Sequence, residues 1–246
     1  MRPQKWLKKE KKMNTKEFFG NKRKVREMTL LAMFIAIIIV MGFVPYLGYI
    51  TVVGTSVTLI HIPVLIGAVI MGRKGGIILG LTFGLTSFFR ALTSVGLDYI
   101  FIFPWVSILP RFIFGLIIYD VYQFFLKLFE GRLLAMVVSF GLLTLIHTLM
   151  VLPLMISAFP LALNLPSVSS VVDSGGEGLL DFMRGTSSIS TIMTIILSVL
   201  VSNGLIEAGL AASVGAVVAD RIIAILKKEE KKEELDEGDE TIASID

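Results

Sequence analysis

Long apolar stretches alternate with short polar segments along this chain. Six apolar stretches lie near residues 28–45, 52–71, 75–93, 101–126, 133–153 and 189–222. A helix needs about 20 predominantly apolar residues to cross a bilayer, and each stretch has roughly that number or more. The pattern therefore predicts an all-α membrane protein, with a bundle of six transmembrane helices over residues 27–226.

Polar segments flank this predicted membrane domain. Residues 1–26 hold eleven of the 23 Lys and Arg residues, and residues 227–246 are mixed and then acidic. The first segment is too long and too charged for the start of a cleaved signal peptide. We expect a basic tail attracted to anionic lipid at one end and a frayed, solvated tail at the other.

The connections between the stretches differ in charge. The turns at 72–75 and 127–132 are tight and basic. The three other connections are longer and carry only two arginines: 46–51, 90–100 and 154–188. Because Lys and Arg accumulate on the cytoplasmic side, both termini are predicted to be cytoplasmic. Long loops carry function more often than short ones, so the outer face is the expected working face.

Composition supports a membrane protein and narrows its chemistry. Hydrophobic residues make up 54% of the chain and the mean hydropathy is +0.81, well above an ordinary globular domain. The chain has no cysteine, which excludes disulfides, zinc–thiolate sites and cysteine nucleophiles. The net charge of +3 averages over oppositely charged ends, so it does not indicate a nucleic-acid partner.

Sequence motifs for catalysis are missing. The chain has no Walker A loop, no HExxH and no GxSxG, so no catalytic or metal-binding residue is expected and the protein is predicted not to be an enzyme. If it moves a solute, the energy comes from an ion gradient or from another subunit. The paired broken helices of many secondary transporters are not evident in the sequence.

Polar residues inside the apolar stretches are the candidate chemistry, since such residues need partners or a wet cavity within a bilayer. Together they predict one outward-opening ligand site. Its expected members are Tyr46, His61, Thr86, Ser87, Arg90, Trp105, Arg111, His147, Asn203 and Glu207. Arg90 and Arg111 favour a ligand with a carboxylate or phosphate, and His147 is expected about two turns from the outer end of the fifth helix. For each residue alone, a structural hydrogen bond is an equally good explanation.

Small residues four positions apart let helix backbones approach closely in lipid. On the otherwise bulky first helix, Ala32 and Ala36 are candidates for docking a partner helix. Two further series are expected to pack within the chain: Gly76, Gly80 and Gly84, and Gly204, Ala208, Ala212 and Ala216.

Five segments together resemble a known family. They are the AxxxA segment Ala32–Ala36, His-Ile-Pro-Val-Leu-Ile-Gly at 61–67, the glycine-rich run 72–87, the Leu-Pro-Arg segment 106–115 and Ser-Asn-Gly-Leu-Ile-Glu-Ala at 202–208. Over residues 25–222, the chain resembles the substrate-binding S component of an energy-coupling factor (ECF) transporter, a vitamin-uptake relative of ABC transporters. The combination looks most like the pantothenate-type branch.

The resemblance implies a function and partners. An S component binds one vitamin near the outer face, with the loop between its first two helices as a gate. It docks through its first helix, here Ala32 and Ala36, on a coupling membrane subunit with two ABC-type ATPases in a prokaryotic cell membrane. ATP is then used by the partners, and this chain binds no cofactor. Pantothenate is an anionic carboxylate, which suits Arg90 or Arg111.

Other functions stay open at this point. S components for riboflavin, folate, pyridoxine or a thiamin precursor share the fold. A self-sufficient ion-coupled carrier would use Glu207 and His147, and a non-transport membrane protein with an assembly or signalling role would leave the bundle empty.

Overall fold

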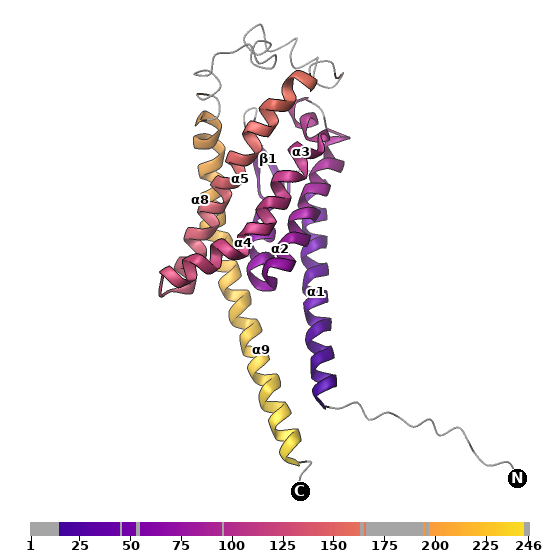
Figure 1. Ribbon diagram of the computed structural model, residues 1–246, viewed down its shortest axis with the longest axis vertical. Coiled ribbons are helices and arrows are strands. Elements are labelled where there is room, and N and C mark those ends of the chain that lie inside the picture. The colour runs from indigo at the N-terminus through magenta and orange to yellow at the C-terminus, as the bar shows by residue number, and fades with distance from the viewer. Residues whose placement is uncertain are drawn as a thin grey trace, which may run out of the picture.

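The computed structural model describes residues 15–44, 46–52, 55–94, 96–162, 165, 194 and 197–243. The elongated molecule is a bundle of helices around one two-stranded hairpin (Figure 1). Its α-helices are α1 (Thr15–Phe43), α2 (His61–Ala91), α3 (Pro104–Ser107), α4 (Leu109–Leu128), α5 (Arg132–Ala162), α8 (Leu205–Leu210) and α9 (Ala216–Ala243). The remaining elements are β1 (Tyr49–Val52), β2 (Thr55–Thr58), the 3-10 helix η1 (Gly96–Ile102) and the π-helical segments η2 (Leu200–Gly204) and η3 (Ala211–Gly215).

Five helical runs within the described residues are long and apolar enough to cross a membrane. They are Lys24–Phe43, His61–Ala91, Pro104–Leu128, Arg132–Ala162 and Leu197–Lys232. The expectation of a mostly helical membrane domain is therefore confirmed. The number of spans depends on the second run, because it is not straight.

The second run, α2, folds back on itself at Gly72. The backbone there has φ +74° and ψ −169°, a conformation that only glycine adopts without strain. A methyl group built on Gly76 would lie 3.1 Å from the Cβ of Ala68, whereas residues eight apart in a straight helix are separated by about 12 Å along its axis. The basic turn predicted at 72–75 is thus a reversal, and it joins two antiparallel arms.

The first arm of α2, residues 61–71, is only about 16 Å long at 1.5 Å per residue, roughly half the hydrocarbon thickness. The prediction that 52–71 forms one membrane-spanning helix is wrong at Val52, the last residue of β1, and over residues 55–60, where the chain forms strand β2 and a turn. β1 and β2 pair antiparallel, with Tyr49 opposite Thr58. The protein is therefore not purely α-helical.

The hairpin lies among the helices, with β2 against η2 and α8. Non-helical backbone at membrane depth is tolerated only where it is enclosed by protein and its polar groups are paired. The pairing of β1 with β2 satisfies part of their backbone N–H and carbonyl groups. The N–H of Leu59 donates to the carbonyl of Gly48 (2.8 Å), which closes the open end of the hairpin.

The helices extend further than the apolar stretches predicted. α5 continues nine residues beyond 153, through Pro153 and Pro160, because neighbouring helices let a membrane helix tolerate proline. Residues 154–162 of the predicted outer loop are thus helical, and most of 163–193 lies outside the described residues. The frayed C-terminal tail is also corrected, since α9 is helical to Ala243. Residues 15–26 of the predicted N-terminal tail belong to α1, and residues 1–14 lie outside the described part.

The N-terminal end of α1 and the C-terminal end of α9 project from the same end of the bundle (Figure 1). An ion pair between Arg26 and Glu230 (2.6 Å) joins the two helices there. Two more ion pairs join other helices: Arg73–Asp120 between α2 and α4, and Arg132–Asp220 between α5 and α9. The N-terminal part of α1 and the C-terminal part of α9 therefore lie on one side of the bundle.

Glycines let α2 and α4 pack at backbone contact. Gly76, Gly80 and Gly84 of α2 face Arg111, Gly115 and the residues just before α4. The predicted packing role of the glycine series is confirmed. The small residues of the last helix serve α5 in the same way, since Ala208 and Ala212 lie beside Gly141.

We predict that Gly80→Ala destabilises the protein by about 1–3 kcal/mol, the usual cost of overpacking. The new methyl group would lie 2.9 Å from the Gly115 Cα and closer still to the Arg111 carbonyl oxygen, so α2 and α4 must separate. The measurement is the thermal unfolding midpoint in detergent.

Gly209→Ala is the matched control, because a methyl group on that helical glycine meets no atom within 4 Å. Its unfolding midpoint should stay the same or rise, since alanine is the better helix former. Equal midpoints for Gly80→Ala and the wild type would contradict the close-packing account.

Candidate functional site

Four ionisable side chains are buried in the middle of the bundle. They are His61 at the start of α2, Arg111 in the first turn of α4, His147 in the middle of α5 and Glu207 in α8. We call these four residues the buried polar cluster. Because burial of polar and charged groups is costly without hydrogen-bond partners, the contacts of each one indicate what the site does.

Arg111 is held by one hydrogen bond and two aromatic rings. Its Nη1 donates to the carbonyl of Val106 at 2.5 Å, and its guanidinium carbon lies 4.7 Å from the ring centre of Phe101 and 5.4 Å from that of Phe83. Its Nε is buried and has no hydrogen-bond partner among the described residues. The guanidinium is therefore fixed in place with a donor still available.

His147 packs between two phenylalanine rings. Its ring centre lies 4.9 Å from that of Phe114 and 5.8 Å from that of Phe83. Its Nε2 is buried without a hydrogen-bond partner. The prediction that His147 lies two turns from the outer helix end is wrong, because α5 continues for 15 residues beyond it.

His61 is the first residue of α2 and is fully buried, at 0% exposure. The ring lies beside the backbone of Thr58 and Glu207. Neither ring nitrogen has a hydrogen bond of normal geometry. Buried polar atoms are nearly always paired in proteins, so this ring, with no hydrogen bond of normal geometry to a described residue, has hydrogen-bonding capacity left for another partner.

Glu207 joins α8 to the hairpin. Its Oε1 accepts the backbone N–H of Thr58, the last residue of β2, at 2.5 Å. The π-helical segments η2 and η3 flank α8 on both sides, and π-bulges occur frequently at functional sites. This hydrogen bond spans 149 residues of sequence and fixes the end of the hairpin against the last helix.

The four residues form one electrostatic unit. Arg111 interacts with Glu207, and His147 interacts with both Arg111 and His61. Phe83 lies near both Arg111 and His147. The arrangement offers unpaired donors and imidazole nitrogens in an apolar, aromatic setting, which is suited to binding a small polar anion.

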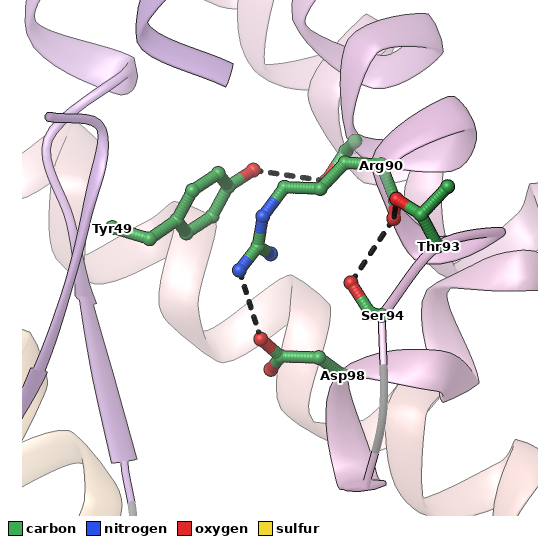
Figure 2. A network of polar contacts seen from close by, with 6 residues as sticks. Tyr49, Arg90, Thr93, Ser94 and Asp98 are labelled. Carbon is green, nitrogen blue, oxygen red and sulfur yellow. Dashed lines mark hydrogen bonds and ion pairs between the residues drawn. The ribbon is translucent and has the colours of Figure 1, made fainter. Parts of the chain in front are cut away.

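A second group of polar residues lies at the junction of β1, the end of α2 and η1 (Figure 2). The Arg90 guanidinium stacks on the Tyr49 ring at 3.9 Å and pairs with Asp98 at 3.1 Å. The Tyr49 hydroxyl is 3.2 Å from Ser87 Oγ. Thr93 and Ser94 donate to the Arg90 carbonyl, each at 3.0 Å. These contacts tie the hairpin to α2.

Comparison with known proteins identifies the family. The family model for ECF transporter substrate-specific components matches residues 26–219. The chain belongs to this family. As a member of a transporter family with apolar helices of spanning length, it is a membrane protein and a transport protein.

Two similar proteins carry descriptive names. The chain is 28% identical over 186 residues to the pantothenate transporter PanT of Leuconostoc mesenteroides subsp. mesenteroides, covering 72% of this chain and 88% of that protein. It is 34% identical over 119 residues to the pantothenic acid transporter PanT of Lactococcus lactis subsp. cremoris, covering 42% of this chain and 60% of that protein.

The remaining predicted site residues of this S component lie outside the buried polar cluster. Thr86 is buried, donates to the Thr82 carbonyl in its own helix and packs near Gly42. Tyr46 is 80% exposed, and Trp105 is 40% exposed and stacks on Phe103. Asn203 is half-buried in η2. The structure thus brings four of the ten predicted residues together and places Ser87 and Arg90 in the neighbouring junction.

The aromatic residues around the site were missing from the predicted set. Phe83, Phe101 and Phe114 surround Arg111 and His147, but a phenylalanine inside an apolar stretch gives no signal that separates it from the core. Tyr49 and Asp98 were also missed. Asp98 had one usable signal, because an acidic residue eight positions after Arg90 in an outer connection is a natural ion-pair partner.

We predict that Glu207→Ala loosens the hairpin. Removing the carboxylate leaves the Thr58 N–H without its acceptor, a loss of about 1.5–3 kcal/mol for a bond to a charged group. Hydrogen–deuterium exchange of the peptide containing residues 49–58 should then speed up about tenfold or more.

Glu207→Gln keeps an acceptor oxygen at the same place, so its hairpin exchange should stay closer to that of the wild type. Ser213→Ala is the control on the same helical run, because the exposed Ser213 hydroxyl bonds only to the Gly209 carbonyl. Unchanged exchange in Glu207→Ala would show that this bond does not hold the hairpin.

Proposed function

We propose that this S component binds pantothenate with high affinity and delivers it to an ATP-driven ECF uptake transporter in the plasma membrane of a prokaryote. The membrane domain would have six helical segments with both termini in the cytoplasm, the short arm 61–71 counting as one of them. Basic residues at the end that carries Arg73 and Arg132 support this orientation.

The observation that carries the proposal is the buried Arg111, whose Nε has no hydrogen-bond partner among the described residues, near His147 and its unsatisfied Nε2 and with His61 in the same cluster. Pantothenate has one carboxylate, two hydroxyls and one amide, so it offers an anion for Arg111 and polar groups for the histidines. The names of the similar proteins point to the same ligand. Arg90 is the weaker candidate for the anion, because Asp98 already pairs with it.

Partner subunits would supply the energy. The proposed partners are the ECF coupling membrane subunit and two ABC-type ATPases, with membrane lipid around the rest of the bundle. The face of α1 that points away from the bundle suits docking. Ala32 and Ala36 are exposed on it, while Phe34 and Ile38 are buried toward α2. Two alanines leave a shallow strip against which another helix can pack closely.

The test of the ligand is direct binding of radiolabelled pantothenate to the purified protein, with riboflavin as a competitor that lacks a carboxylate. Arg111→Met should weaken pantothenate binding by about 1.5–3 kcal/mol, the worth of a hydrogen bond to a charged group. Arg111→Lys should restore only part of this, because lysine lacks the planar fork. Unchanged affinity in both variants would remove Arg111 from the site.

If α1 docks on the coupling subunit, changes on its exposed face should stop transport without changing the affinity for the ligand. Ala32→Leu combined with Ala36→Leu should abolish pantothenate uptake in cells that express the ECF partners, while the affinity of the purified protein stays the same. Two added isobutyl groups would hold the partner helix away. Val218→Leu adds bulk to an exposed site on α9 and should transport normally.

Normal uptake by the variant that combines Ala32→Leu with Ala36→Leu would contradict docking through this strip. Energy coupling is read in the same cells: uptake should stop when ATP is depleted even with the proton gradient maintained. Uptake that survives ATP depletion and collapses with an uncoupler would favour the ion-coupled carrier that uses Glu207 and His147.

A further inference from the structure

We infer that His61 recognises a hydroxyl group of the ligand, so that the site selects a hydroxylated carboxylate over a plain one. This inference rests on the proposed function and adds a specificity-determining residue to the proposed pantothenate site. It starts from the hydrogen-bonding capacity of the one fully buried imidazole in the buried polar cluster.

A neutral imidazole presents one N–H donor and one acceptor nitrogen. Neither nitrogen of His61 has a hydrogen bond of normal geometry to a described residue, although the backbone of Thr58 and of Glu207 lies beside the ring, which is 0% exposed. A carboxylate offers only acceptors and satisfies just the N–H. A hydroxyl group both donates and accepts, so it can bond to the acceptor nitrogen of one imidazole, and a second hydroxyl can accept from the N–H.

The surroundings of His61 exclude an anion on that side. The ring lies next to the backbone of Thr58 and of Glu207, whose carbonyl oxygens are acceptors, and the Glu207 carboxylate accepts the Thr58 N–H nearby. A ligand carboxylate placed there would face other hydrogen-bond acceptors without a donor between them. Such an unfavourable contact contributes to specificity, because it weakens the binding of the wrong ligand. The anionic end of the ligand therefore belongs at Arg111.

His147 connects the two ends of the site. It interacts electrostatically with both Arg111 and His61, and its Nε2 is unpaired between the rings of Phe83 and Phe114. A ligand reaching from Arg111 to His61 would pass this nitrogen, where a polar group such as an amide finds a partner. The order of groups is then anion, central polar group and hydroxyl, which is the order of groups along pantothenate.

The experiment compares pantothenate with two analogues in which one hydroxyl or both are replaced by hydrogen. Competition against radiolabelled pantothenate gives the affinity of each for the purified wild type, His61→Leu and His61→Gln. The wild type should bind the dideoxy analogue about 10–100-fold more weakly than pantothenate, because each lost bond leaves a buried partner unpaired. In His61→Leu, pantothenate should fall to near the affinity of the dideoxy analogue, and the discrimination should shrink to about threefold or less.

The glutamine variant tests the chemistry rather than the shape. Its amide carries a donor and an acceptor, so it should retain a part of the discrimination that leucine loses. Ser139→Ala is the control: Ser139 is buried and bonded to the Met136 carbonyl of its own helix, and its variant should discriminate as the wild type does.

The outcomes separate the two proposals. Failure of the wild type to bind pantothenate overturns the proposed function, and this inference with it. Binding of pantothenate and the dideoxy analogue with equal affinity overturns this inference and leaves the proposed function standing. Full discrimination in a folded His61→Leu variant shows that another residue reads the hydroxyls. If the leucine variant does not fold, the wild-type comparison and the glutamine variant still decide.

Discussion

An unpaired polar group inside an apolar medium is costly in free energy, and this cost constrains each part of the structure. Helices satisfy their own backbone groups, which is why most of the chain is helical. The hairpin at 49–58 is the exception, and it is possible because its strands pair with each other and Glu207 accepts the last strand's N–H. The same cost makes the unsatisfied nitrogens of His61, His147 and Arg111 informative: they are the places where we propose that a ligand completes the bundle.

Close packing and binding are coupled through α2 and α4. Gly80 and Gly115 bring the two backbones together, and Arg111, one turn before Gly115, is thereby set beside Phe83 of α2. The reversal at Gly72 returns the chain so that both arms of α2 serve the site, His61 from the first arm and Phe83 from the second. A small-residue stripe that reads as packing in the sequence therefore also positions the binding groups.

The hairpin connects the site to the rest of the molecule at two points. Tyr49 contacts Arg90 and Ser87 near the end of α2, and Thr58 contacts Glu207 on the last helix. The resemblance to S components implies that this connection between the first two helices acts as a gate. Apolar packing holds it as well, since Val57 is buried and Tyr49 packs against the hydrophobic core.

The sequence by itself determined the class of protein, the positions of most helices, the basic side of the bundle and the identity of the ionisable residues, because hydrophobic run length and charge are properties of the chain alone. It also indicated the family through five short segments. It did not determine the hairpin, since residues 52–60 are apolar enough for either a helix or a buried strand. Only the tertiary structure decided which polar residues meet: Tyr46 and Trp105 turned outward, Arg90 found Asp98, and four residues from four helices converged with aromatic rings between them. Such convergence depends on how separate helices pack, and no local pattern records it.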